Sequence, residues 1–123
     1  MTSEPSLPPG RPCGTGALSA ADPALYGELL GLVEKPVRYV GQEWNQVVKP
    51  PAAGLARIAF AFPDTYEIGM SHLGLRILYD LLNAVDDVAA ERVFVPARDM
   101  AAGMRAAGVP LFTLETVSAV RDC

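Results

Sequence analysis

The spacing of apolar residues changes twice between Leu55 and Val85. Residues 55–62, LARIAFAF, form a short apolar run with one charge, which predicts a buried strand. Pro63 lacks a backbone donor, so the chain must leave the sheet there. From His72 apolar residues recur every three or four positions, which predicts an amphipathic helix. Its expected inner stripe consists of Gly74, Ile77, Leu78, Leu81, Leu82 and Val85. At Gly74 the missing side chain would let the helix approach the strand closely.

Two more strands and a helix are predicted downstream. After a polar turn at residues 86–87, residues 91–95, ERVFV, are β-rich and end at a proline. Residues 98–107 have helical spacing, with Met100, Met104 and Ala107 inward and Gly108 as the residue that ends the helix. Residues 109–114, VPLFTL, predict a third strand. The order βαβαβ with short connections predicts right-handed crossovers and a parallel sheet.

Upstream of the sheet the pattern predicts one helix and an irregular arm. Asp22-Pro23 is typical of a helix start, and Pro36 stops the helix. Its stripe is Leu25, Leu29, Leu30 and Val33, and its two glycines weaken it, so it needs a surface to lie on. Within the arm, residues 35–49, Trp44 is either an aromatic plug between arm and domain, which we favour, or a surface anchor for a partner.

The fold class that follows is α/β. We expect a truncated doubly wound parallel sheet of flavodoxin-like or Rossmann-like type, βαβαβ, preceded by an N-terminal helix and arm. Residues 1–20 are rich in Pro, Gly, Ser and Thr without apolar spacing, and we expect them to be a disordered leader. Residues 21–54 would be the helix and connecting arm, and residues 55–123 an incomplete α/β domain. With three strands and an open edge, the sequence looks cut off.

Composition narrows the function classes. Half the residues are apolar and the net charge is −4, with Lys and Arg scattered, so we predict no nucleic-acid partner. Apolar runs are too short to span a bilayer and no secretory signal is seen, so we predict no membrane association and a cytoplasmic protein. Cys13 and Cys123 form neither a disulfide framework nor a metal site by their spacing.

The loop PDTYEIGMS is the best candidate site, because open α/β sheets bind ligands where strands end and helices begin. Its carboxylates could do acid–base work or bind a cation, but helix capping or solvation is the simpler interpretation. A serine could cap the next helix, a glycine could admit a ligand or only turn the chain, and a tyrosine could stack on a flat cofactor or cover the sheet end. We predict no catalytic residue and no metal site here. The cofactor-binding candidates are Asp64, Tyr66, Glu67, Gly69, Ser71, His72 and Gly74.

Four blocks of the chain resemble a known family. EKPVRYVGQEWNQVVK, FAFPDTYEIGMSHLGLRILYDLLN, AERVFVPARDM and GVPLFTLE are similar, in order and spacing, to the amino-terminal part of an uncharacterised family of radical S-adenosylmethionine (radical SAM) proteins. The similarity covers about residues 30–115, and PDxYEIGMSHLGL is its specific part. In that family a cobalamin-binding-like α/β domain is fused to a radical SAM core.

The resemblance implies chemistry that this chain cannot perform by itself. Radical SAM enzymes hold a [4Fe–4S] cluster with three cysteines of a CxxxCxxC loop, and the remaining iron binds S-adenosylmethionine. This chain has no such loop. The cluster and S-adenosylmethionine therefore belong to the full-length family only, and we expect the isolated chain to be inactive.

Cobalamin is the candidate cofactor that the resemblance adds. The base-off cobalamin fingerprint is DxHxxG, whereas the first strand here is followed by Asp64-Thr65-Tyr66. His72 lies eight residues after Asp64; it could ligate cobalt, but we favour a bond to nearby backbone at the helix start. We expect the chain to bind cobalamin weakly or not at all.

Two classes of function remain open. In the first, the chain is a fragment of a radical SAM protein whose α/β domain binds a small-molecule cofactor or substrate and whose partner is the missing C-terminal radical SAM core. In the second, it is a non-enzymatic docking module that meets another polypeptide through the arm around Trp44 and the open sheet edge.

Overall fold

The computed structural model describes residues 23–123. The leader predicted over residues 1–20, and Asp22 as a helix cap, lie outside these residues. The first described element is helix α1, Pro23–Leu32, which begins at the proline that the sequence placed at the helix start.

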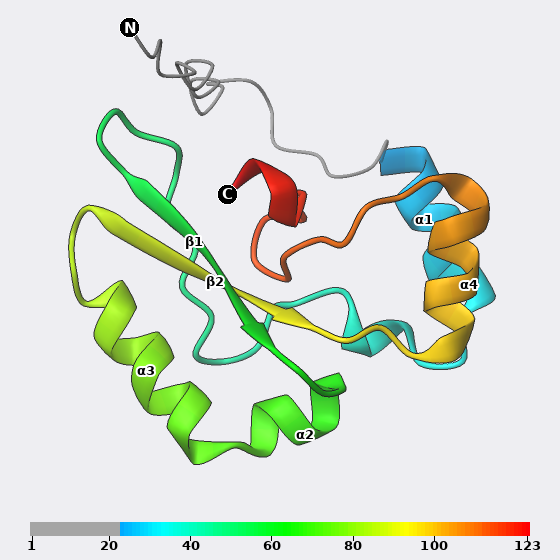
Figure 1. The fold of residues 1–123 in the computed structure, drawn as a ribbon, viewed down its shortest axis with the longest axis horizontal. Helices are drawn as coiled ribbons and strands as arrows, with labels where there is room; N and C mark the ends of the chain where they lie inside the picture. Colours follow the sequence, from blue (N-terminus) through cyan, green and yellow to red (C-terminus); the bar gives the residue numbers. More distant parts are fainter. Residues whose placement is uncertain (1–22) are drawn as a thin grey trace, which may run out of the picture.

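Two parallel strands form the sheet. Strand β1, Ala56–Phe62, pairs with β2, Val88–Phe94, in a register that sets Ala56 beside Val88 and Phe62 beside Phe94. Helix α3, Leu73–Asn83, connects them and packs on β2 (Figure 1). The predicted α/β class with parallel strands is therefore confirmed. β2 begins three residues earlier than the run ERVFV indicated.

The predicted loop after β1 contains a short helix. Residues Tyr66–Ser71 form α2, and the backbone N–H of Gly69 donates to the Thr65 carbonyl at 2.9 Å. The next helix, α3, is capped by His72, whose Nδ1 accepts from the Leu75 N–H at 3.2 Å. Ser71 was expected to be that cap, and this is wrong: its hydroxyl donates to the Glu67 carbonyl at 2.6 Å, inside α2.

The face that α3 turns inward also differs from the prediction. Leu75 and Tyr79 are buried, whereas four residues of the predicted stripe, Ile77, Leu78, Leu81 and Val85, are about half exposed or more. Gly74 does not touch the strand, because a Cβ there would meet only the His72 imidazole at 3.0 Å. The helix is apolar on most sides, so spacing alone did not fix its orientation. Tyr79 fixes the orientation, because its hydroxyl donates to the Glu115 carboxylate and accepts the Val47 N–H beneath the helix.

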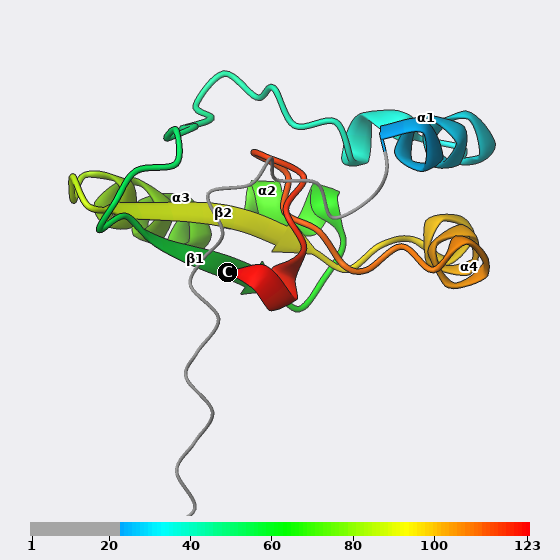
Figure 2. The ribbon, with the colours of Figure 1, turned by 90° about the horizontal axis from the view of Figure 1, so that it is seen from above.

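Helix α4, Arg98–Ala107, has the predicted bounds and ends at Gly108, which adopts a left-handed conformation with φ of 70°. Met100 and Met104 are buried as expected, whereas Ala107 is exposed. α4 lies beside α1 rather than over the sheet (Figures 1 and 2). We call this part the helical lobe; its buried residues are Leu29, Tyr39, Met100, Met104, Val109, Phe112 and Ala119. The surface that α1 was expected to need is thus α4.

The predicted third strand, residues 109–114, is wrong. Among residues 23–123 the sheet has two strands, and this segment makes only one isolated antiparallel bridge, Phe112 with Ala119, before the 3₁₀ turn Val120–Asp122. The Leu114 N–H does donate to the Arg92 carbonyl of β2 at 2.9 Å. The adjacent Arg92 N–H, however, donates to the Glu115 carboxylate at 2.7 Å, so a side chain takes the place of the next backbone partner.

The arm runs from α1 to β1 through the 3₁₀ turn Pro36–Arg38. Lys49 fixes its far end, because its ammonium donates to the carbonyls of Asn83 at 2.9 Å and Val85 at 2.7 Å at the C-terminus of α3. No helix within the described part of the chain has the length and apolar character needed to cross a membrane.

Candidate functional site

A slot opens where the two strands end. Its walls come from the arm, the start of α2, the segment after β2, α4 and the C-terminal segment. Parallel strands bring their carboxyl ends to one edge, and the Val95 N–H donates to the Asp64 carbonyl at 2.9 Å, which joins the two strand ends there. The space between the lining atoms that water can occupy is about 20 Å³, room for about one water molecule, and it opens to solvent. We call this space the slot.

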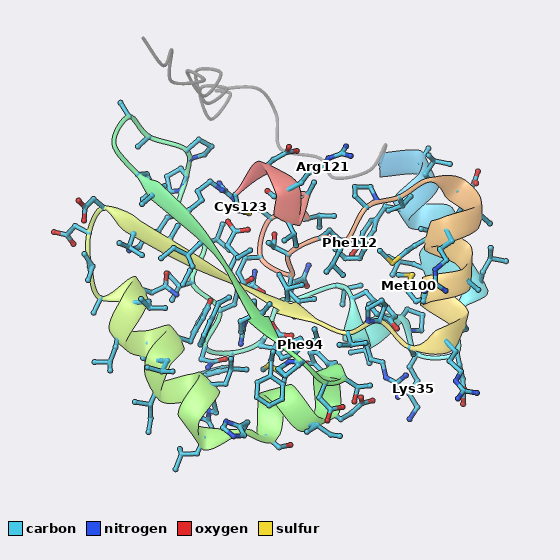
Figure 3. The ribbon with its side chains drawn as sticks, viewed as in Figure 1. Lys35, Phe94, Met100, Phe112, Arg121 and Cys123 are labelled. Carbon is cyan, nitrogen blue, oxygen red and sulfur yellow. The ribbon has the colours of Figure 1, made fainter. Side chains whose placement is uncertain are left out.

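The lining of the slot is mainly aromatic and apolar. Figure 3 shows Phe94 at the carboxyl end of β2, and Phe112 on the segment between the sheet and the helical lobe. Tyr66 meets Phe94 edge to face, with ring centroids 5.8 Å apart. Tyr39 is held by its hydroxyl, which accepts the Ala97 N–H at 3.1 Å. Such a lining favours a flat apolar group over a phosphate.

Polar groups also border the slot. The Arg38 guanidinium donates to Glu67 at 2.6 Å, and this hydrogen bond keeps the pKa of the Glu67 carboxyl below its ordinary value. The lining also contains the Thr65 side chain and the hydroxyl-bearing Tyr39 and Tyr66. Burial, assisted by the Glu43 carboxylate, raises the pKa of Tyr66 to about 12, so its phenol stays protonated near neutral pH.

Of the seven predicted site residues, Tyr66 alone lines the slot. Glu67 stands at its rim through the pair with Arg38. The Asp64 carboxylate accepts the Thr65 N–H at 2.7 Å. Among residues 23–123 no other side chain is seen to bond to this carboxylate. Gly69 is buried under Phe94, where a Cβ would overlap the ring, so this glycine serves helix packing.

The remaining three predicted residues make local contacts. Ser71 bonds within α2, and Gly74 lies next to the His72 ring. The His72 side chain accepts a backbone N–H of α3, as the simpler of the two interpretations predicted. Its ring packs against Phe62, with centroids 5.0 Å apart. Whether any of these residues binds a cofactor remains a prediction.

A buried ionic network next to the slot was not predicted. Arg92 is 2% exposed; it donates to Glu115 at 2.7 Å and to Glu43 at 3.2 Å, and its guanidinium lies 4.3 Å from the centre of the Tyr79 ring. Burial raises the pKa of the Glu115 carboxyl and opposes the effect of Arg92. A second pair, Arg57 with Glu91, lies on the other face of the sheet. The one sign of this network in the sequence was the pair of adjacent charged residues, Glu91 and Arg92, at the start of the predicted strand ERVFV.

Trp44 does not plug the domain. Its side chain is fully exposed, at 104% of the reference value, so the favoured interpretation of this residue is wrong. Residues 23–123 contain no group of three or more His, Cys, Asp and Glu side chains that could hold a metal ion.

Comparison with known proteins identifies the part of the chain that carries the resemblance. Residues 74–123 match the family described as radical SAM proteins, N-terminal. The match to the radical SAM N-terminal family begins in α3 and runs through β2, α4 and the C-terminal segment. It supports a similarity of this segment to the N-terminal part of radical SAM proteins, and it includes the slot walls from Phe94 to Leu114. No curated protein and no solved structure matches the chain.

Proposed function

We propose that this chain is the N-terminal α/β part of a radical SAM protein and that the aromatic side chains around the mouth of its slot contact a flat apolar part of a small-molecule cofactor or substrate. The ligand would be presented to a radical SAM core, which is the expected partner. The observation that carries the proposal is the overlap between the matched family segment and the slot walls from Phe94 to Leu114. The protein would work in the cytoplasm.

The chain's own residues do not fit an iron–sulfur cluster. Such a cluster needs three cysteine thiolates at CxxxCxxC spacing, and the sequence holds two cysteines at distant positions. Radical chemistry is therefore assigned to the partner core. What the described residues supply is a binding surface: aromatic walls from Tyr66 and Phe94 and a guanidinium from Arg38 at the rim.

Cobalamin fits this site poorly. His72 lines no part of the slot, and its Nδ1 already accepts the Leu75 N–H. We therefore expect weak or absent binding of hydroxocobalamin, and a spectral shift at micromolar concentration would contradict this expectation.

The test of the ligand proposal is an amide NMR titration with adenosine, S-adenosylmethionine and hydroxocobalamin as separate probes. We expect at least one probe to shift the amides of Thr65, Tyr66 and Ala97. Ala97→Trp fills the slot and should abolish the shifts, whereas the distant Leu32→Trp, on an exposed position of α1, should keep them. Probes that leave these amides unchanged, or shift them equally in Ala97→Trp, would contradict the proposal.

A second candidate is a non-enzymatic docking module. The observation that favours it is the fully exposed Trp44. Tryptophan is among the residues that most often dominate protein–protein interfaces.

A further inference from the structure

Strand β1 has one paired edge and one open edge. Among residues 23–123 it pairs with β2 alone, and Figure 2 shows it on the outer side of the sheet. The Ala56 N–H donates to the Asp87 carbonyl at 2.7 Å, so Ala56 and every second residue after it turn their backbone groups toward β2. Arg57, Ala59 and Ala61 therefore turn theirs to the open edge, where they meet no backbone partner within the described chain.

The opposite edge of the sheet, along β2, is closed. The Asn83 side-chain amide bonds both backbone groups of Ala90, at 3.0 Å to the N–H and 3.2 Å to the carbonyl. The Arg92 N–H donates to the Glu115 carboxylate at 2.7 Å, and the Arg92 carbonyl accepts the Leu114 N–H at 2.9 Å. Side chains and the C-terminal segment thus satisfy these outward groups of β2, and within residues 23–123 nothing does the same for β1.

β1 also lacks the features that keep an edge strand from pairing. Natural edge strands carry exposed charges, a proline or a bulge, or are very short. β1 is a regular strand of 7 residues without a proline. Its single charged side chain, that of Arg57, is 5% exposed and pairs with Glu91 on one face of the sheet, so it does not guard the edge. The edge is therefore free to accept another strand.

The side of β1 that faces α3 indicates which side chains a neighbouring strand would carry. Phe60 and Phe62 pack into the cluster around Leu75 of α3, and alternation along the strand puts Ile58 on the same side. Because α3 packs on β2, Ile58 stays 36% exposed. A neighbouring strand would bury this surface with apolar residues at alternate positions. Nucleic acids and small molecules do not offer backbone groups at strand spacing, so the open edge fits a polypeptide.

We propose that β1 is a docking edge and that an extended polypeptide segment with apolar residues at alternate positions adds to it as a third strand. The backbone of the segment bonds Arg57, Ala59 and Ala61, and its apolar side chains cover Ile58. This inference does not rest on the proposed function, because the open edge runs along β1 and the slot lies beyond the strand ends. A slot that binds no ligand would leave the docking edge standing, and a failed docking edge would leave the slot untouched.

Amide hydrogen exchange of the full chain tests whether the edge is open. We expect the amides of Ala59 and Ala61 to exchange fast, and those of Ile58 and Phe60, which face β2, to exchange slowly. Slow exchange of Ala59 and Ala61 in the free monomer would show that the edge is already paired and would overturn the proposal. Slow exchange in a dimer, identified by sedimentation, would assign the edge to a second copy and would overturn it as well.

A library of random peptides displayed on phage tests the partner. We expect the selected peptides to carry apolar residues at alternate positions. As synthetic peptides they should slow the exchange of the Ala59 and Ala61 amides and leave those of Thr65 and Ala97, at the slot, unchanged. A library that yields no binder, or binders that leave Ala59 and Ala61 unprotected, would overturn the proposal.

Two proline variants locate the binding edge. Ala59→Pro removes an outward N–H, which an edge strand tolerates, and should raise the dissociation constant of the selected peptides about tenfold or more. Ala53→Pro places the same ring in the turn before β1, which the Leu55 N–H closes on the Ala52 carbonyl, and should leave peptide binding unchanged. Circular dichroism checks that both variants are folded.

N-methylated peptides give a test that leaves the protein unaltered. In an added strand one alternate set of amides faces β1 and the other set faces away. Methylation of the first set should abolish binding, and methylation of the second set should preserve it. Equal losses from the two sets, or unchanged affinity for folded Ala59→Pro, would contradict strand addition.

Discussion

The buried side chains of β2 include the charged Glu91 and Arg92, whereas those of the helical lobe are aliphatic, methionine or aromatic. Both regions exclude water, but in different ways. The helical lobe removes apolar surface from water, and this stabilisation does not depend on the direction in which the side chains meet. The sheet side holds charges that must each find a partner, so each contact fixes a geometry. Burial of apolar side chains in the helical lobe stabilises the fold. The ion pair between Arg92 and Glu115 fixes where the C-terminal segment lies on the sheet.

Arg92→Met should have the largest effect on stability. It removes the cation shared by Glu43 and Glu115 and leaves both carboxylates buried without it, which should cost about 3–5 kcal/mol of unfolding free energy. Urea unfolding followed by circular dichroism measures the loss. Arg38→Gln, which breaks an exposed pair, is the matched control and should cost less than about 1 kcal/mol.

The triple variant with Glu43→Gln and Glu115→Gln should restore part of the stability lost in Arg92→Met. Equal losses for Arg92→Met and Arg38→Gln would show that the buried network is no more sensitive than a surface pair. In that case the comparison between the two regions would fail.

Met100→Ala probes the helical lobe in the same assay. Met100 is completely buried and points to the boundary between α4 and α1 (Figure 3), so truncation should leave a cavity and cost about 2–5 kcal/mol. Leu32→Ala, on an exposed position of α1, should change the unfolding free energy by less than about 0.5 kcal/mol. In contrast to Arg92→Met, the stability lost in Met100→Ala should not be recovered by neutralising Glu43 and Glu115.

Sequence patterns located what depends on spacing and turn chemistry. β1, the bounds of α4 and the left-handed Gly108 followed from these signals, because proline and glycine punctuate the chain there. The third strand and the inner face of α3 did not, because both depend on pairing between residues far apart in sequence. Glu115 occupies the N–H of Arg92, and Tyr79 turns inward to reach Glu115; no local pattern encodes either contact.

The sequence predicted only part of the candidate site, because most of its walls also depend on contacts between residues far apart in sequence. The strand-end position and Tyr66 followed from the alternation of elements, but the other slot walls come from four separate segments. Trp44 was misjudged because a tryptophan side chain is usually mostly buried, whereas here it is fully exposed, next to the polar Glu43 and Asn45 in sequence.

Gly69→Ala tests how tightly α2 is packed at the sheet end. The new methyl group would overlap the Phe94 ring, and overpacking of this kind should cost about 1–3 kcal/mol. Phe94→Leu makes room, so the double variant should lose less than the sum of the two single losses. Gly27→Ala, on α1 with open space around it, should be neutral or stabilising. Additive losses in the double variant would show that Gly69 and Phe94 are not in contact.

The smallest expected effect is a dependence of stability on alkaline pH. Burial raises the pKa of Tyr66 from 10.0 to about 12, so the folded state keeps the phenol proton that the unfolded state loses first. This group's contribution is complete below pH 10 and is lost as the pH rises toward about 12. Urea midpoints should therefore fall across that window, and Tyr66→Phe should make the fall shallower. Tyr26→Phe, in the helical lobe, is the matched control: burial raises the pKa of Tyr26 as well, but to a smaller extent, so its removal should flatten the curve less. A larger flattening from Tyr26→Phe than from Tyr66→Phe would assign the alkaline sensitivity to the helical lobe and reverse the comparison.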